Sequence, residues 1–337
     1  MANENLPEFI QALLSPSVYD HAASDIRLVQ THISYVLLAG DYVYKFKKPV
    51  NFGFLDFSTL DKRQYCCEQE LVLNRRLCPD IYLGLVTVTL EQGQYRLGGG
   101  GEVIEYGVRM VRMPEERMMV NVIAAGELGR EHIDSLVETL VPFYRQAERS
   151  EEIDRFGTAE AVAVNVLENF DQTREFVDGG ALSRDRFERI SNYARTVLAR
   201  QDLFARRIAQ GRIRDCHGDL YSANICLADK VYIYDCIEFN QRFRYCDVAS
   251  DIAFLAMDLD FHGLADLSAY LVERFSRTSG DDGLVEMLDF YKCYRAYVRG
   301  KIGLFTAADP AVDETVRQAS LEGAAKYFHL AESYVAG

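Results

Sequence analysis

Three polar side chains near the middle of the chain have the types and spacing that phosphate chemistry requires. Asp219 and Asn224 are separated by four residues, and Asp235 directly follows the apolar run 231–234. Moving a phosphoryl group onto a hydroxyl requires a carboxylate that accepts the hydrogen bond, and eventually the proton, of that hydroxyl. It also requires oxygen ligands that hold Mg²⁺ against the phosphates. Asp219 is the candidate base, and Asn224 and Asp235 are the candidate metal ligands.

Two short apolar runs flank a polar turn in this stretch. The runs are 225–227 and 231–234, and the turn is 228–230. This pattern predicts a β-hairpin, which would bring Asp235 back beside Asn224. The first aspartate alone is a weak signal, because Asp, Gly and a neighbouring His are common in loops. Its combination with the hairpin and the second aspartate is much more specific.

The same residues resemble a known family. His217-Gly218-Asp219-Leu220 with Asn224, followed by Ile233-Tyr234-Asp235, resembles the aminoglycoside phosphotransferase and choline kinase-like family, whose fold is similar to that of protein kinases. The continuation 235–240 and 244–251 is similar to a bacterial branch whose longer members often carry a fused P-loop kinase domain. The pattern G-x-x-x-x-G-K-[ST] is absent from this chain, so we expect that extra domain to be missing here.

The resemblance implies an α+β, two-lobed, protein-kinase-like fold. Residues 1–113 are expected to form a small β-rich nucleotide-binding lobe, and 114–337 a larger, mainly helical catalytic and substrate lobe. ATP, with GTP as an alternative, and Mg²⁺ are the implied cofactors. Asp219 is then the base, and His217 shapes its loop by hydrogen bonding.

Local patterns predict the elements of both lobes. Alternating apolar residues and turn signals predict strands, and apolar residues at helical spacing predict helices. The predicted strands are 26–30, 35–39, 42–47, 81–90, 94–97 and 103–113, with Gly98–Gly101 as a hairpin tip. The predicted helices are 6–14, 58–77, 121–145, 159–176, 183–210, 265–278, 284–305 and 312–335.

The third predicted strand carries two lysines. Lys45 and Lys47 lie two residues apart and should share one face of the strand. The resemblance implies that one of them contacts the α- and β-phosphates, and Lys45 is the preferred candidate. The alternative is that such lysines only protect an exposed strand edge. No G-x-G-x-x-G precedes this strand, which departs from protein kinases. The resemblance makes the turn 31–34 the candidate phosphate cover, with the Ser34 hydroxyl as a donor.

Further positions follow from the order of elements in the family. A glutamate of the helix 58–77 is expected to pair with the strand lysine, and Glu70 is preferred over Glu68. The strand that ends near Val111 to Met113 is expected to present its backbone to adenine. An ordinary strand ending at a proline is the alternative for this last segment.

Three acidic residues follow the central stretch. Asp247 and Asp251 lie four residues apart on a predicted helix. The resemblance implies that Asp247 braces the catalytic loop, while helix capping is the alternative. Glu238, three residues after Asp235, is a weaker candidate for a metal or substrate ligand.

Composition limits the class of protein. The chain has 337 residues, a net charge of −14 and no long basic run, which argues against a nucleic-acid partner. Its eight cysteines include no C-x-x-C pair, which favours reduced thiols in the cytosol. The first eight residues have no signal-peptide pattern, and no apolar run approaches the ~20 residues that span a membrane. We therefore expect a cytoplasmic protein without a membrane partner.

The predicted reaction transfers the γ-phosphoryl group to a hydroxyl of a small molecule. The acceptor class stays open, since sugars, amino alcohols, nucleosides, aminoglycosides and protein serine all carry hydroxyls. The alternative is a pseudokinase-like nucleotide-binding regulatory or scaffold module. A metal-dependent phosphohydrolase is a third reading, but the stretch has too few additional ligands for a two-metal site. The sequence does not indicate an oligomeric state.

Overall fold

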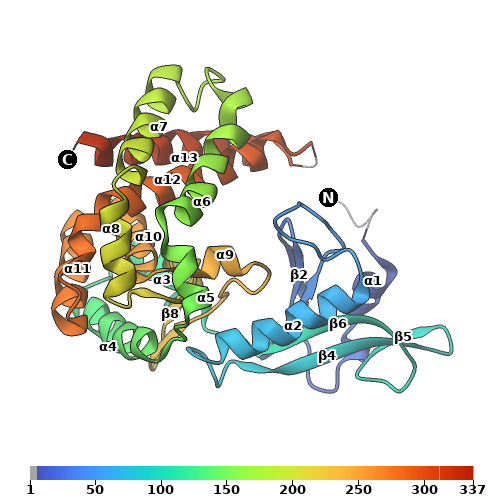
Figure 1. Cartoon of the computed structure of the whole chain (residues 1–337). Coiled ribbons are helices and arrows are strands. Elements are labelled where there is room, and N and C mark those ends of the chain that lie inside the picture. The colour runs from blue at the N-terminus through green and yellow to red at the C-terminus, as the bar shows by residue number, and fades with distance from the viewer. Residues whose placement is uncertain (1–5, 311, 337) are drawn as a thin grey trace. The chain divides into compact units, whose positions relative to one another are not determined.

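The computed structural model describes residues 6–310 and 312–336 and divides the chain into two units (Figure 1). The first unit contains the chain up to Arg117 together with Tyr232–Gln241, and the second contains Met118–Val231 and the chain from Arg242 onward. The sequence predicts a single boundary after residue 113. The structure differs because the segment 232–241 returns to the first unit. The first five residues, where the sequence predicts no signal, lie outside the described residues.

The first unit is built on a six-stranded antiparallel sheet in the order β1-β2-β3-β6-β4-β5. All six predicted strands form, and their ends lie within two residues of the predicted ends. Period-two alternation and glycine turns are local signals, which is why these strands can be recognised without the fold. The strands are β1 (Arg27–Gln30), β2 (Ser34–Ala39), β3 (Tyr42–Lys47), β4 (Tyr82–Glu91), β5 (Gln94–Leu97) and β6 (Glu102–Val111).

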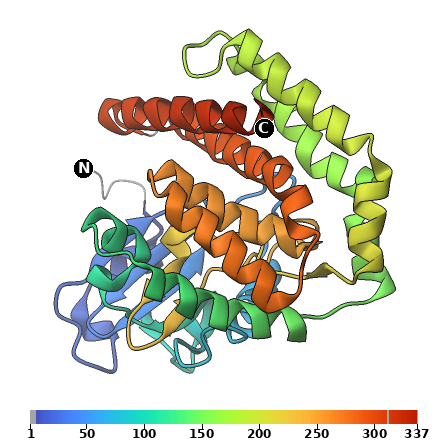
Figure 2. The ribbon, with the colours of Figure 1, turned by 90° about the vertical axis from the view of Figure 1, so that its left-hand side faces the viewer.

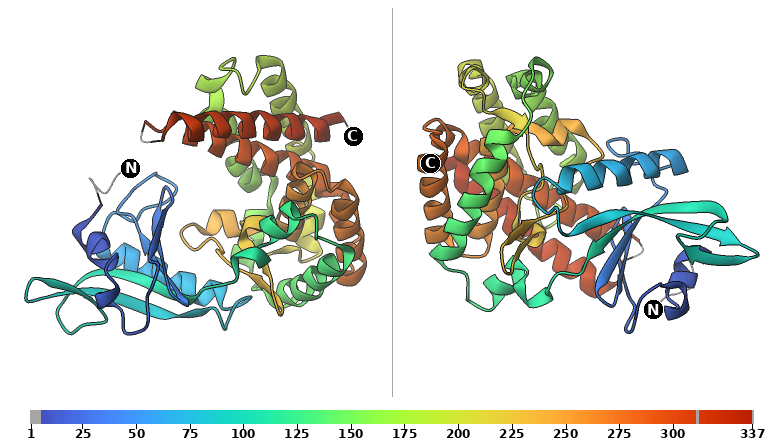
Figure 3. Two further views of the ribbon diagram at one scale, coloured as in Figure 1. Left: turned by 180° about the vertical axis from the view of Figure 1, so that it is seen from behind. Right: turned by 90° about the horizontal axis from the view of Figure 1, so that it is seen from below.

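One helix packs on each face of this sheet. Tyr44 and Phe46 of β3 pack in the core that also contains Ile10 of α1 (Glu8–Leu13). Successive strand side chains point to opposite faces, so Lys45 and Lys47 face the other way, toward α2 (Leu60–Asn74). Figure 3 shows α2 running along β4 and β6, which it contacts.

Polar contacts fix α2 on the sheet. Its first turn is capped by Thr59, whose hydroxyl accepts the Lys62 backbone N–H at 3.3 Å. One turn later, the buried Arg63 donates through Nε to both carboxylate oxygens of Glu105 on β6, at 2.8 and 2.9 Å. The buried face of α2 therefore includes charged side chains, which apolar periodicity does not reveal.

The returning segment 232–241 is held by the end of α2 and the turn after it. Asn74 accepts the Cys236 backbone N–H at 2.9 Å through its amide oxygen. The Cys78 thiol donates to the Ile233 carbonyl at 2.8 Å. These contacts join residues more than 150 positions apart and place Asp235 in the first unit.

The second unit is mainly helical, as predicted, with short strands around its central loop. Its helices are α3 (Met119–Ala124), α4 (Arg130–Gln146), α5 (Glu151–Asp154), α6 (Ala159–Thr173), α7 (Arg184–Leu198), α8 (Gln201–Ala209), α9 (Gln241–Arg244), α10 (Val248–Phe261), α11 (Ala265–Ser279), α12 (Leu284–Ala308) and α13 (Glu314–Ser333). The strands β7 (Ile213–Asp215) and β10 (Tyr245–Asp247) pair antiparallel. The strand β8 (Ile225–Leu227) lies in this unit, whereas β9 (Val231–Ile233) begins in it and continues into the segment 232–241. Both form where the two short apolar runs predict them.

Two of the predicted helices are wrong as continuous elements. The helix predicted over 121–145 stops at Ala124, because Gly126 adopts a left-handed φ of 71°, and α4 starts after Gly129. The helix predicted over 183–210 is α7 followed by α8, because Arg200 leaves the helical region with ψ near 68°.

The core of the second unit forms around α10. Every residue from Val248 to Leu259 is buried, and the helix packs against α11 and α12. The helices α12 and α13 lie side by side (Figure 2). They approach closely at Gly300, where an added Cβ would lie 2.7 Å from the Phe328 ring. Over residues 6–310 and 312–336, no helix combines the length and apolar character needed to cross a membrane.

A substitution at the buried Arg207 of α8 tests how much its ion pairs stabilise the second unit. Its guanidinium pairs with the buried carboxylates of Asp247, at 2.7 and 2.8 Å, and Asp281. Arg207→Met should lower the free energy of unfolding by about 3–5 kcal/mol, because two buried carboxylates lose their cation. Urea unfolding followed by circular dichroism measures this loss. The neighbouring exposed Arg206, which also contacts two carboxylates, provides the control, and Arg206→Met should cost less than about 1 kcal/mol. Equal losses for the two variants would contradict the prediction.

Candidate active site

Two lysines of β3 share one carboxylate of α2. The Lys45 ammonium lies 3.0 Å from Glu70 Oε1, and the Lys47 ammonium donates to Glu70 Oε2 at 2.8 Å. The Glu70 side chain is 1% exposed. The other candidate, Glu68, is exposed and hydrogen-bonds along its own helix. The structure therefore brings Glu70, and not Glu68, to the lysines.

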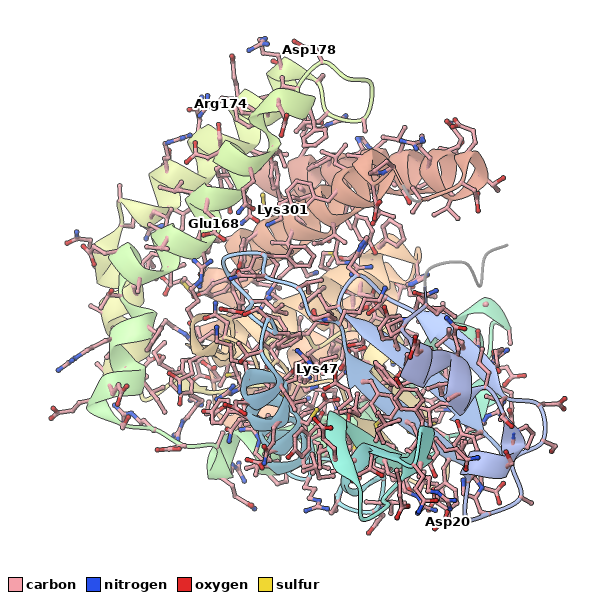
Figure 4. All side chains as sticks on the ribbon, turned by 90° about the vertical axis from the view of Figure 1, so that its right-hand side faces the viewer. Asp20, Lys47, Glu168, Arg174, Asp178 and Lys301 are labelled. Atoms are coloured by element: carbon pink, nitrogen blue, oxygen red, sulfur yellow. The ribbon has the colours of Figure 1, made fainter. Side chains whose placement is uncertain are left out.

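The two lysines differ in their second partner and in their exposure. Lys45 is 15% exposed and also pairs with Asp235, whose side chain is 42% exposed. Lys47, marked in Figure 4, is 2% exposed and also pairs with the buried Glu238. Burial lowers the pKa of Lys45, but Asp235 and Glu70 raise that pKa by more, so the ammonium stays charged. Lys45 is thus the lysine whose ion pairs reach a partly exposed carboxylate.

Asp235 has an unusual backbone conformation. Its φ is +63°, a left-handed value that few non-glycine residues adopt. Its N–H donates to the Tyr82 hydroxyl at 3.3 Å, and the next N–H is held by Asn74. Such conformations persist where surrounding contacts determine them, and they concentrate at functional positions. Here the strained backbone keeps the Asp235 carboxylate beside Lys45 and partly exposed.

Glu238 belongs to the buried network. Burial raises the pKa of the Glu238 carboxyl, and Lys47 opposes this effect. Its side chain is 5% exposed, so Glu238 is not presented at the surface of the first unit as a metal or substrate ligand would be. Its carboxylate instead compensates the charge of the buried Lys47.

The remaining nucleotide-site candidates of the first unit lie at strand ends. Ser34 opens β2 opposite Lys47, and its hydroxyl is buried without a hydrogen-bond partner. Val111 ends β6, and its N–H donates to the Ile81 carbonyl at 2.9 Å. Met113 follows β6 and is half-buried. None of these positions departs from a regular strand end, so their contact with a nucleotide stays a prediction.

In the second unit, a buried aspartate braces the loop that contains Asp219. The carboxylate of Asp251 accepts the backbone N–H groups of His217 at 2.8 Å and Gly218 at 3.0 Å. Gly218 has a φ of +87°, which a residue with a side chain rarely adopts. The Tyr144 hydroxyl also donates to Asp251, at 3.0 Å. The loop is therefore shaped through its backbone by a side chain of α10.

This arrangement corrects the expectation for Asp247. Asp247 caps α10, accepting the Ala249 N–H at 2.9 Å, and pairs with the buried Arg207. The capping alternative is therefore confirmed, and the loop is braced by Asp251, one helical turn later. Capping directs the Asp247 carboxylate at the helix start, whereas the side chain of Asp251 reaches the loop.

Asp219 is positioned by its neighbours in the loop. Its N–H donates to His217 Nδ1 at 3.3 Å. Asn224 donates through Nδ2 to the carboxylate and to the carbonyl of Asp219, both at 3.0 Å. With the amide nitrogen used in this way, Oδ1 is the Asn224 atom that can ligate a cation. Arg295 of α12 adds a contact that no local pattern predicted, since its Nη1 donates to the Gly218 carbonyl at 3.0 Å.

A second polar cluster lies between α6 and α12 (Figure 4). Arg242 donates to both carboxylate oxygens of Glu168, at 2.8 and 2.9 Å. Lys301 donates to Gln172 at 2.8 Å, and burial lowers the pKa of Lys301 to about 8. The Arg242–Glu168 pair joins α9 to α6, and the Lys301–Gln172 hydrogen bond joins α12 to α6.

The chain resembles known proteins in sequence and in fold. No protein-family profile matches it. Uncharacterized proteins of Mycobacterium tuberculosis and Mycobacterium bovis are 37% identical over 287 residues, which is 85% of this chain and 55% of those proteins. The chain thus spans about half the length of the curated relatives it matches.

Solved structures identify the fold. A choline/ethanolamine kinase family protein from Mesorhizobium loti has a TM-score of 0.52 at 10% identity, over 97% of both chains. An amicoumacin kinase, solved with AMP-PNP and Ca²⁺, has a TM-score of 0.52 at 12% identity, over 96% of this chain and 93% of that one. The chain has the protein-kinase-like fold of these small-molecule kinases. The predicted α+β fold class is therefore confirmed, as is the predicted resemblance at the level of the fold.

The shared Glu70 makes stability depend on pH. Lys45 and Lys47 outweigh burial and lower the pKa of Glu70 from 4.5 to about 2. A carboxyl whose pKa falls on folding stabilises above its unfolded pKa, and this contribution disappears as the pH falls toward 2. At pH 6 the free energy of unfolding should therefore be larger for the wild type than for Glu70→Gln. The difference in the pKa of Glu70 between the folded and unfolded states should contribute roughly 3 kcal/mol of this margin.

Denaturant unfolding at pH 6 and pH 3 measures the margin. The difference in unfolding free energy between the wild type and Glu70→Gln should become smaller as the pH falls from 6 to 3. The difference between the wild type and the exposed Glu68→Gln should stay small at both pH values. A margin for Glu70→Gln that does not change with pH would contradict the prediction.

Proposed function

We propose that this chain is a Mg²⁺-dependent phosphotransferase that moves the γ-phosphoryl group of ATP, or of GTP, to a hydroxyl of a small molecule. The observation that carries the proposal is the buried Lys45–Glu70 ion pair between β3 and α2, with Asp235 on the same lysine. In kinase-like enzymes, a strand lysine paired with a helix glutamate holds the nucleotide phosphates. The fold of the chain supports the same reaction class.

Asp219 is the proposed base. Its carboxylate accepts the hydrogen bond of the acceptor hydroxyl and takes its proton as the oxygen attacks the γ-phosphorus. The new bond joins the acceptor oxygen to phosphorus, and the bond from phosphorus to the β–γ bridging oxygen breaks, so ADP leaves with that electron pair. Asn224, which donates to Asp219, keeps the carboxylate in position.

The nucleotide is proposed to bind the first unit. Lys45 contacts the α- and β-phosphates, and Glu70 orients the ammonium between its two ion-pair partners. The backbone near Val111 and Met113 faces adenine. Ser34 can contribute its hydroxyl only if its surroundings rearrange, because that hydroxyl is buried.

The donor set suits Mg²⁺ that arrives with a nucleotide. Among the described residues, no cluster of three or more His, Cys, Asp or Glu side chains could hold a resident metal. Mg²⁺ in phosphoryl-transfer enzymes is usually held by one or two protein oxygens together with phosphates and water. Asn224 Oδ1 and the Asp235 carboxylate are the proposed protein ligands. Bound Mg²⁺ would neutralise charge on the phosphates during transfer.

Asp235→Ala tests nucleotide binding. A ligand that binds only the folded state raises its stability by about 2.7 kcal/mol at one hundred times its Kd. Mg²⁺ with ATP should raise the thermal midpoint of the wild type. In Asp235→Ala, the part of this rise that depends on Mg²⁺ should be lost. If neither ATP nor GTP shifts the wild type, the kinase proposal fails and a scaffold module becomes the better reading.

Asp219→Asn tests the base. Removing a general base should lower transfer by about 10²- to 10⁴-fold while the Kd for Mg²⁺–ATP stays unchanged. Coupled detection of ADP in the presence of candidate acceptors measures transfer, and calorimetry measures binding. The exposed Asp229 of the turn 228–230 supplies the control Asp229→Asn, which should transfer at the wild-type rate. Full activity in Asp219→Asn would remove the base assignment.

A further inference from the structure

An arginine on α12 lies beside the loop that contains Asp219. Arg295 of this helix donates to the Gly218 carbonyl, and Arg299 lies one helical turn further along. The Arg299 guanidinium lies over the Tyr221 ring, 4.7 Å from its centroid. Tyr221 is two residues from Asp219 in the sequence. Arg299 is therefore a cation within the second unit that adjoins the proposed base.

Arg299 lacks the carboxylate partner that several other covered arginines have. Within the part of the chain that the structure describes, no ion pair joins Arg299 to an Asp or Glu, and its Nε is buried without a hydrogen-bond acceptor. Burial lowers the pKa of Arg299, but Tyr221, Tyr327 and Asp219 raise that pKa by more, so the charge persists. Covered arginines that do pair with carboxylates are Arg63, Arg207, Arg242 and Arg244.

The acidic residue of α10 near this region is already engaged. Asp258 is buried and accepts the Ser222 backbone N–H at 3.0 Å. A partly buried cation without a paired anion is costly, and a ligand that supplies an anion would offset that cost.

Aromatic rings around Arg299 form the kind of surface that binds amines. Tyr221 stacks on Phe254 with 5.3 Å between ring centroids, and Tyr327 stacks on Phe261 at 3.8 Å. Arg299 lies 4.7 Å from the Tyr221 centroid and 5.7 Å from that of Tyr327. An ammonium ligand would seek these ring faces, but the guanidinium already occupies them. A cationic acceptor would therefore meet a like charge here.

We propose that Arg299 binds an anionic group of the acceptor, so that the acceptor is a hydroxyl compound that carries a carboxylate or a phosphate. This inference rests on the proposed function, because it places the acceptor beside Asp219. The guanidinium presents paired N–H donors that match both oxyanions. The two rings hold the guanidinium in place, Tyr327 also hydrogen-bonds to it, and no described carboxylate pairs with it. Arg299 is in this view the residue that selects an acid over a neutral alcohol or an amine.

The test uses matched acceptors that differ in charge. The probes are glycerol, D-glycerate and glycerol 3-phosphate, and glucose, D-gluconate and glucose 6-phosphate, with ethanolamine as the cationic arm. Coupled detection of ADP gives kcat and KM in the presence of Mg²⁺–ATP. Calorimetry without nucleotide gives the Kd of each probe. Comparison of carboxylate with phosphate ester in each set shows which oxyanion the site takes.

In the wild type, an anionic probe should exceed its neutral counterpart at least tenfold in kcat/KM and in affinity. Arg299→Gln should raise KM and Kd for the anionic probe at least tenfold and leave KM for ATP unchanged. Arg299→Lys, which keeps the positive charge, should keep part of the preference for anionic probes. It serves as the control in case Arg299→Gln has a folding defect. The exposed Arg277→Gln of α11 makes the same change of charge and should behave as the wild type.

Three results would overturn the inference. They are an absence of preference for anionic probes, unchanged anion binding in Arg299→Gln, and an equal fall in kcat for all probes, which would place Arg299 at the transferred phosphoryl group. Failure of the proposed function gives a different result. If no probe is phosphorylated while an anionic probe binds the wild type and not Arg299→Gln, the anion site stands and the kinase proposal does not. Phosphorylation of ethanolamine in preference to the acids, which is one form of the first result, would keep the kinase proposal and remove the role of Arg299.

Discussion

The first unit depends on one buried carboxylate that is shared by two lysines. Glu70 can be buried only because Lys45 and Lys47 compensate its charge, and each lysine has a second carboxylate, Asp235 or Glu238. Removing Lys47 would leave the buried carboxylates of Glu70 and Glu238 with too little positive charge, which is far more costly than losing an exposed ion pair. This chain of alternating charges joins β3, α2 and the returning segment 232–241, so the position of Asp235 follows from the burial of Glu70.

The second unit uses a buried carboxylate in a similar way. Asp251 accepts two consecutive backbone N–H groups of the loop, and the positive φ of Gly218 allows both to point at it. The loop conformation is therefore set from α10, through the backbone of the loop.

The fold does not determine which phosphoryl acceptor a protein uses. Proteins that share it include kinases with different small-molecule acceptors, so specificity has to come from individual side chains. In this chain the side chains beside the proposed base, Asp219, are aromatic and cationic. The net charge of −14 says little about this local environment, because the charge that an acceptor meets is set by the few groups within several ångströms.

The sequence by itself determined the strands of the first unit, the helical character of the second and the types of residue around Asp219, because alternation, turn residues and short motifs act over a few positions. It left Lys47 open beside the preferred Lys45, and Glu68 open beside the preferred Glu70, because local pattern does not say which side chain a distant segment will bury. The bracing role of Asp251 instead of Asp247, and the contact of Arg295 with a loop 77 positions earlier in the chain, were likewise decided only by tertiary structure. The physical reason is that burial and charge compensation belong to pairs of residues, and the partners here come from parts of the sequence that only folding brings together.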